Sequence, residues 1–288
     1  MTGAAAVAVT GWSVHLPGVD LAARLPVLAG VLPSMPAVPA ERAHELLGRK
    51  GLLGKDGATR LALCAVHQAL DLPPRAPRPA GPADPDTAVV VSSNLGNLSS
   101  VVEVVRAVRA GGRRDVSPLA VPNASSNVVA STVAIWFRFG GPNMMVCSGA
   151  TAGLDAVGLG ATLLRTARAA RVVVVGTEPA DDLAAALHGG ALRAGAACVV
   201  LEPADRVPDA PRLSTVHSGQ SGATDLDLTV ACGDLYGAHG VALVALAAAL
   251  LATGAAPDPV RVACGDDTDG WRGAELRRIR AQVRTSRT

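Results

Sequence analysis

The chain has 288 residues, a formal net charge of +2 and an apolar fraction of 49%. This length is enough for one large domain or two smaller ones, each with a buried core. The near-neutral charge and the scattered arginines argue against a nucleic-acid partner, which would require a concentrated basic surface.

The cysteines and the apolar runs exclude further classes of protein. The five cysteines show no CxxC pair and no metal-ligand spacing, so we expect buried free thiols and neither a metal nor a cofactor. The opening MTGAAAVAVTGWSVHLPG has no basic leader and predicts a first strand in a cytoplasmic protein. The longest apolar run, 241–252, is too short to cross a bilayer, so we expect no membrane segment.

Valine-rich runs and helical spacings alternate along the chain. Short runs bounded by Gly or Pro predict strands at 7–14, 87–93, 144–147, 171–176, 196–201, 226–231 and 260–263. Apolar residues at helical spacing predict helices at 59–70, 98–110, 126–137, 151–169 and 237–253. This alternation indicates an α/β fold with largely buried sheets.

Three segments interrupt the pattern. Residues 73–86 are rich in proline and predict a surface loop. The break at 178–192 predicts a seam between two halves of one domain, 1–180 and 181–288. The arginine-rich tail 272–288 is typical of a solvated terminus, with an acidic partner as the alternative.

Residues 117–179 carry a dense series of motifs in a fixed order. They are VPN at 121–123, an arginine turn at 138, GPN at 141–143, GLDA at 153–156 and GTE at 176–178. This series resembles the N-terminal half of the β-ketoacyl synthases, and AVAVTGWSVHLPG and GLLGKDGATRLALCAVHQAL resemble the first strand and the first long helix of that family. ALRAGAACVVLEPADRV and GDLYGAHGVALVALAAALLATG are weaker, correctly ordered matches to its C-terminal half.

The resemblance implies a thiolase-like fold. In that fold two pseudo-symmetric βαβαβ-type halves form one layered α-β-α-β-α domain. The matches in the second half of this sequence are compressed, so the resemblance also implies a shortened C-terminal half.

Condensation in this family uses a cysteine thiolate at a strand-to-helix turn and two histidines. Counting without a gap between GPN and GLDA places the cysteine position at Ala150, whose methyl group cannot form a thioester. Cys147 lies three residues earlier and is expected in the strand. The histidine positions correspond to Cys232 and Asp234. The resemblance therefore implies that no catalytic residue is retained.

Other parts of the catalytic pattern are altered as well. The glycine-rich loop that carries a gating phenylalanine is replaced by VACGDDTDGWRG. His217 comes too soon after the 196–201 strand to be a displaced catalytic histidine, and we expect it in a loop or at a strand end. His239 lies among small residues and is expected to be packed or to cap a helix.

The resemblance also implies a dimer. Chain-length factors are ketosynthase-like proteins without the nucleophilic cysteine, and they pack on a catalytic ketosynthase and shape its acyl tunnel. The corresponding interface candidates here are Asn123, Asn127, Trp136, Phe137 and Phe139. The alternatives are core positions for the aromatic residues and helix caps for the asparagines.

Three hypotheses follow. The first is a non-catalytic subunit that forms a heterodimer with a ketosynthase in polyketide or fatty-acid-like biosynthesis, with acyl carrier protein as a further partner. The second is a repurposed acyltransferase, hydrolase or cyclase that uses Cys147, Ser148, or Cys232 with Asp234. The third is a homodimeric scaffold for acyl carrier proteins.

Overall fold

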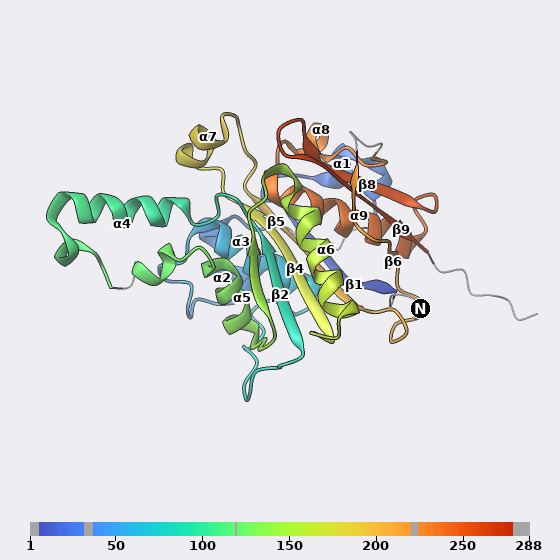
Figure 1. Cartoon of the computed structure of the whole chain (residues 1–288), viewed down its shortest axis with the longest axis horizontal. Helices are drawn as coiled ribbons and strands as arrows, with labels where there is room; N and C mark the ends of the chain where they lie inside the picture. Colours follow the sequence, from blue (N-terminus) through green and yellow to red (C-terminus); the bar gives the residue numbers. More distant parts are fainter. Residues whose placement is uncertain (1–5, 32–36, 119, 220–223, 279–288) are drawn as a thin grey trace, which may run out of the picture.

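The computed structural model describes residues 6–31, 37–118, 120–219 and 224–278. Their strands form one curled mixed sheet in the order β3-β2-β4-β5-β1-β6-β9-β7, with β8 paired to β9 (Figure 1). The strands are β1 Val7–His15, β2 Thr87–Ser92, β3 Asn143–Val146, β4 Arg171–Glu178, β5 Gly195–Pro203, β6 Arg212–Leu213, β7 His217–Gly219, β8 Val260–Asp266 and β9 Gly270–Arg277. β2, β3 and β4 run parallel, and β5 is antiparallel to both β4 and β1.

Helices cover both faces of the β3-β2-β4-β5-β1 part of the sheet. α3 (Gly57–Ala69) and α5 (Val128–Phe137) pack on one face, and α6 (Ala152–Arg165) and α9 (His239–Thr253) pack on the other. β4 explains why the sequence pattern is continuous rather than alternating. Val173 faces the first helix pair and Val174 the second, so the strand is buried on both sides.

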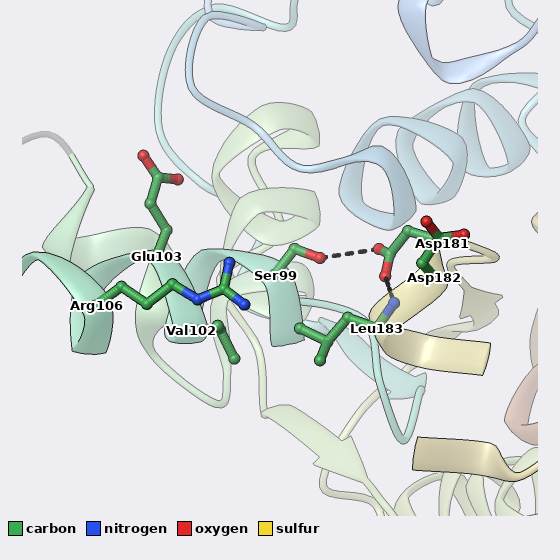
Figure 2. Close-up of a pocket in the computed structure, with 7 residues that line it drawn as sticks. All are labelled: Ser99, Val102, Glu103, Arg106, Asp181, Asp182 and Leu183. Carbon is green, nitrogen blue, oxygen red and sulfur yellow. Dashed lines mark hydrogen bonds between the residues drawn. The ribbon is translucent and has the colours of Figure 1, made fainter. Parts of the chain in front are cut away.

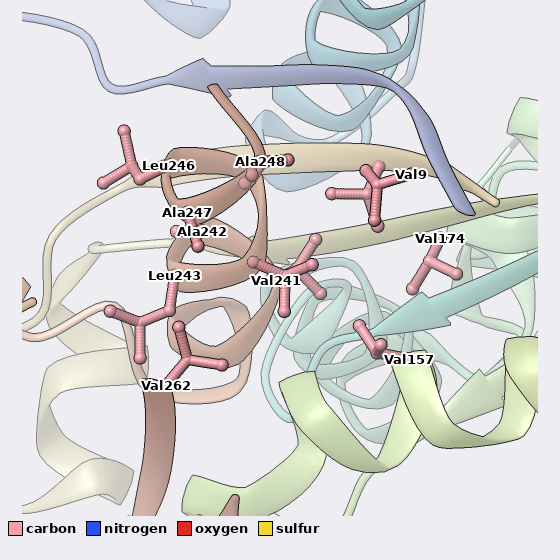
Figure 3. Packing of buried hydrophobic residues seen from close by; sticks show 14 of the residues in the cluster. Val9, Val157, Val174, Val241, Ala242, Leu243, Leu246, Ala247, Ala248 and Val262 are labelled. Atoms are coloured by element: carbon pink, nitrogen blue, oxygen red, sulfur yellow. The ribbon is translucent and has the colours of Figure 1, made fainter. Parts of the chain in front are cut away.

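The β8–β9 hairpin forms a further layer on the far side of α9. Val262 packs against α9 near Val241 and Leu243 (Figure 3). The outer face of the hairpin carries the exposed Arg261 and Arg277 instead of an apolar surface for another helix. The fifth layer of the expected α-β-α-β-α arrangement is therefore reduced, as a shortened C-terminal half requires.

The remaining helices connect these elements. They are α1 Leu21–Arg24, α2 His44–Leu47, α4 Leu98–Gly111, α7 Asp182–His188 and α8 Leu228–Cys232, with 3₁₀ turns η1 Pro26–Leu28, η2 Ala40–Arg42, η3 Arg113–Asp115, η4 Val121–Ala124, η5 Gly149–Thr151 and η6 Tyr236–Ala238. α4 differs from the rest because it is long and projects away from the sheet, on the side opposite β8 and β9 (Figure 1).

The segment Tyr236–Thr253 has the length and hydropathy of a membrane-spanning helix, but 78% of it is buried inside the protein. Every residue from Gly240 to Leu251 is buried. A helix that is apolar on all sides fits a protein core. The apolar surface of α9 is therefore used in packing between the two parts of the sheet.

Two predicted segments differ from the structure. The predicted strand at 226–231 is instead helix α8, because Asp227 caps its N-terminus by accepting a hydrogen bond from the Val230 amide. The predicted solvated tail begins as strand β9, and residues 279–288 lie outside the described residues. β5 pairs with both β4 and β1, so the sheet continues across the predicted seam near residue 180, and the two-half division stays a prediction.

Candidate functional site

A sharp turn of residues 147–151, here called the β3–α6 turn, joins the edge strand β3 to α6. Gly149 has φ +68°, a left-handed conformation that glycine adopts without strain. Asn94, which follows β2, holds this residue from both sides: its Nδ2 donates to the Gly149 carbonyl and its Oδ1 accepts from the Gly149 amide, each at 3.0 Å. The turn is thus fixed in position by the neighbouring strand end.

Ala150 lies half-buried on this turn, one residue before Thr151 and the start of α6. Its amide donates a 2.8 Å hydrogen bond to Oδ2 of Asp269, a residue of the β8–β9 hairpin tip. The predicted nucleophile position and the predicted gate segment are therefore in direct contact, although 119 residues separate them in sequence.

Ser148 points to a carboxylate and not to a histidine. Its hydroxyl donates to Oδ2 of Asp155 at 2.6 Å, and Thr151 Oγ1 donates to the same oxygen at 2.7 Å. Arg272 of β9 forms a 2.7 Å ion pair with the other oxygen. Burial raises the pKa of Asp155, but these hydrogen bonds and the arginine outweigh it and lower that pKa. An ionised, arginine-paired carboxylate is a weak base for activating a hydroxyl.

Cys147 follows the last residue of β3 and is exposed. Its Sγ donates to the Ser93 carbonyl at 3.1 Å. Partial burial and the nearby Glu178 carboxylate both raise the pKa of this thiol. At neutral pH the residue is therefore a thiol, and the thiolate that acyl transfer needs is disfavoured.

The two predicted histidine positions lie together but in different surroundings. Cys232 ends α8, is buried, and donates to the Leu228 carbonyl, and burial raises its pKa to about 11. Asp234 lies in the following loop and pairs with His188, with 2.9 Å between Oδ2 and Nε2. Cys232 was expected at the end of a strand, so its helical position weakens its correspondence to a catalytic histidine.

His188 is the residue of this group that sequence reasoning missed. It ends α7, in a stretch without a recognisable motif, and its ring lies 4.5 Å from the ring of Tyr236. Burial, with contributions from the charges of Asp269 and Glu178, raises the pKa of Tyr236. The His188–Asp234 pair and the β3–α6 turn are thereby parts of one polar region.

Glu178, the last residue of the GTE motif, is fully buried in this region. Its carboxylate accepts hydrogen bonds from the Asn94 amide at 2.6 Å, the Leu95 amide at 3.1 Å and the Ser93 hydroxyl at 3.2 Å. Burial, opposed by these bonds, raises its pKa to about 7. Glu178 joins the end of β4 to the segment after β2, which in turn holds the β3–α6 turn.

The two asparagines proposed for the interface make contacts within the chain. Asn123 is buried and accepts a 3.1 Å hydrogen bond from Lys55. Asn127 precedes α5 but does not cap it with its side chain, which donates at 2.6 Å to Oδ1 of Asn143 on β3.

The three aromatic residues proposed for the interface lie in the core. Trp136 and Phe137 are each 5% exposed and Phe139 is 8% exposed. The guanidinium carbon of Arg78 lies 3.5 Å from the Trp136 ring centroid. These side chains present almost no surface to a partner, which corrects the expected interface role. The exposed side chain of helix α5 is that of Ile135, which is 76% exposed.

The sequence profile of the β-ketoacyl synthase N-terminal domain matches residues 50–205. The chain belongs to the β-ketoacyl synthase family. A relative in sequence is the 3-oxoacyl-[acyl-carrier-protein] synthase 2 of Coxiella burnetii (strain RSA 493 / Nine Mile phase I), with 28% identity over 97 residues. That match covers 34% of this chain and only 23% of the Coxiella protein.

Similar solved structures include ketosynthases from polyketide pathways. The ishigamide ketosynthase/chain length factor has a TM-score of 0.73 at 19% identity, over 96% of this chain and 100% of that one. The AntDE ketosynthase, in complex with the type II polyketide synthase acyl carrier protein AntF, has a TM-score of 0.74 at 14% identity, with the same coverage. Ketosynthase twelve of the bacillaene synthase from Bacillus amyloliquefaciens has a TM-score of 0.65 at 14% identity, over 96% and 73%. These matches confirm the thiolase-like fold.

Within this family, the assignment of Ala150 to the nucleophile position stays a prediction from the sequence. The structure places Ala150 on a strand-to-helix turn, where a helix N-terminus favours negative charge. Around it, the side chains that chemistry would use are a thiol of raised pKa, a hydroxyl bound to a carboxylate, and a histidine–aspartate pair.

Proposed function

We propose that this chain is a non-condensing, chain-length-factor-like subunit that forms a heterodimer with a catalytic ketosynthase. In that complex it shapes the acyl tunnel of its partner during polyketide or fatty-acid-like biosynthesis. Ala150 supports the non-condensing part of the proposal, because no thiol is present at that position. The raised pKa values of Cys147 and Cys232 argue against a substitute nucleophile.

The exposed apolar residues of helix α4 are the observation that supports a partner subunit. Five of its 14 residues are valines, and none of its residues is buried. Val105 and Val108 are each 42% exposed. α4 is attached near its start, where Ser99 donates to Asp181 at 2.9 Å (Figure 2). Val101, Val102 and Val104 are half-buried. A long helix whose apolar side chains are left partly exposed by the described residues is typical of an interaction surface.

The charges beside these valines favour a partner of different sequence. Arg106 and Arg109 lie on α4, and Arg113 and Arg114 follow on η3, all exposed. None of these four forms an ion pair with another described residue. If this surface lay across a two-fold axis, a second copy would place arginines against arginines, whereas an acidic partner surface would neutralise them.

A groove of about 370 Å³ separates α4 from α7. Its lining comprises Ser99, Val102, Glu103, Arg106, Asp181, Asp182 and Leu183 (Figure 2). The mixed charge of these residues does not suit an apolar acyl chain. We therefore assign the acyl tunnel to the partner, with α4 of this chain packed against it. The edge strand β3, which pairs only with β2 among the described strands, offers a second contact by sheet pairing.

Co-expression with a catalytic ketosynthase from the same organism, taken from a neighbouring gene where one exists, tests the proposal. We expect a 1:1 complex in native mass spectrometry. Changing Arg106→Glu together with Arg109→Glu should weaken its dissociation constant by about tenfold or more, because charge complementarity becomes repulsion. The matched control is Arg168→Glu with Arg261→Glu, which reverses one exposed charge after α6 and one on β8 and should leave affinity unchanged. A stable monomer that binds no ketosynthase would contradict the proposal.

A second candidate is a repurposed activity on carrier-bound acyl chains. The His188–Asp234 pair favours it, because a carboxylate that orients an imidazole is a common general-base arrangement. Incubation with an acyl carrier protein thioester separates the candidates. We expect the intact mass of the chain to stay unlabelled at pH 7.5 and the release of carrier thiol to stay at the background rate.

A labelled cysteine would instead favour acyl transfer. Thiol release that is lost in His188→Ala, with no labelled chain, would favour a hydrolase or cyclase. Carrier binding without any ketosynthase would support the third possibility, a homodimeric scaffold.

A further inference from the structure

The tip of the β8–β9 hairpin packs directly against the β3–α6 turn. Asp269 Oδ2 accepts the Ala150 amide at 2.8 Å. This amide belongs to the η5 turn that leads into α6, where unpaired backbone N–H groups attract an anion. An internal carboxylate thus occupies the place that the turn offers to a negatively charged group.

The two segments fit each other closely. A Cβ on Gly149 would overlap the Asp269 carboxylate, so glycine is needed both for this approach and for its positive φ. The hairpin tip is held in shape by Asp266, whose Oδ1 accepts the Thr268 amide at 2.8 Å and the Asp269 amide at 2.6 Å.

A second tie connects the hairpin to the same helix. Arg272 of β9 forms its ion pair with Asp155 of α6 at 2.7 Å. Asp155 lies in the first turn of α6 and also accepts hydrogen bonds from Ser148 and Thr151. The hairpin therefore contacts the start of α6 at two points, which fixes Asp269 over Ala150.

This arrangement opposes acyl transfer by itself. A thiolate at position 150 would attack a thioester carbonyl carbon and form a tetrahedral oxyanion, which needs backbone N–H donors. The Ala150 amide is already bound to a carboxylate. The negative charge of that carboxylate also opposes both a thiolate and an oxyanion beside it.

We propose that Asp269 is a second determinant of the non-condensing state, which keeps the β3–α6 turn closed to acyl thioesters independently of Ala150. This inference deepens the proposed function and rests on it for its biological meaning. Its physical content concerns only this chain, so it is tested without a ketosynthase.

The test introduces a thiol at position 150. Ala150→Cys is made alone, with Asp269→Ala, and with Asp267→Ala as the matched control, since Asp267 is an exposed neighbour on the same hairpin tip. All variants carry Cys147→Ser, because Cys147 is the exposed cysteine among the described residues and would compete with the thiol introduced at position 150. The probe is the N-acetylcysteamine thioester of hexanoic acid, and the readout is the intact mass. In the reaction the cysteine thiolate displaces the N-acetylcysteamine thiolate, which takes a proton from water.

We expect the Ala150→Cys/Asp269→Ala chain to be acylated at least about tenfold faster than either Ala150→Cys alone or the Asp267→Ala control. Iodoacetamide alkylation should show the same order, with the pH midpoint of the reaction moved downward when Asp269 is removed. Equal rates with and without Asp269 would overturn the inference.

A second measurement does not depend on the introduced thiol. Hydrogen exchange of the Ala150 amide should be faster in Asp269→Ala than in the unmodified chain or in Asp267→Ala, because its acceptor is lost. Unchanged exchange would also overturn the inference. Failure to bind a ketosynthase, in contrast, would contradict the proposed function and leave both of these results intact.

Discussion

Replacing Gly240 with alanine is expected to lower the free energy of unfolding by about 3 kcal/mol. Gly240 lies in the first turn of α9, where its backbone meets the backbone of α6. A Cβ there would lie 2.5 Å from the Leu154 amide nitrogen and 2.9 Å from Cys264 Sγ. A Cβ on Gly153 would in turn lie 2.6 Å from the Gly240 nitrogen. Because two of the three nearest atoms are backbone atoms of α6, which cannot move aside as the end of a flexible side chain can, α6 and α9 would have to separate.

A loss of stability in Gly240→Ala would be specific evidence for the close contact between α6 and α9. Glycine to alanine inside an exposed helix normally stabilises by about 1 kcal/mol. Gly158→Ala is the matched control on α6, because the atoms nearest to a Cβ there belong to the Val216 side chain, at 3.3 Å or more. Urea denaturation monitored by circular dichroism should place this control within about 1 kcal/mol of the parent. Equal stability of Gly240→Ala and Gly158→Ala would contradict the close helix contact.

The strands could be predicted where burial on both faces left a continuous pattern. The run Val172–Val175 is an example: each residue packs on one helix pair or the other, so every position is apolar. The segment 226–231 looked like a strand for a different reason: the buried Leu226 and Leu228 lie on either side of the exposed Asp227, which is also the spacing of a strand. Five or six residues cannot separate the two periodicities, and the Asp227 cap decided in favour of a helix.

The candidate site was predicted only where it is local in sequence. Counting from GPN to GLDA was enough to place Ala150, and the structure puts that residue on a strand-to-helix turn. The Asp269 contact joins residues 119 positions apart, and the His188–Asp234 pair joins residues 46 apart. No pattern in the sequence specifies such pairs, because they depend on how the hairpin and α7 fold back.

The surface that faces a partner could not be predicted from residue type. The sequence left Trp136 and Phe139 open between an interface, where aromatic residues are common, and the core, and the structure places them in the core. α4 was predicted as a helix from its spacing, while the exposure of its valines is a tertiary property. Amphipathic spacing predicts that a helix has an apolar face, and only the packed structure shows that the described residues leave this face partly exposed.

Glu178 makes the stability of the protein depend on pH. In the folded chain, burial raises the pKa of this carboxylate from 4.5 to about 7, although Asn94, Leu95 and Ser93 all donate to it. The folded state therefore binds a proton more tightly than the unfolded state does. The stability from this proton is fully present below about pH 4.5 and is lost as the pH rises through about 7.

Glu178→Gln removes this titration. Between about pH 5 and about pH 8, we expect the free energy of unfolding of the parent to fall by about 2–3 kcal/mol relative to that of this variant. Urea denaturation at several pH values measures it. Glu103→Gln, which removes one exposed carboxylate from α4, is the matched control for the loss of one negative charge. A parent that gains stability over the same range relative to Glu178→Gln would mean that the hydrogen-bond donors around Glu178 outweigh burial. Glu178 would then hold the segment after β2 as a permanent carboxylate.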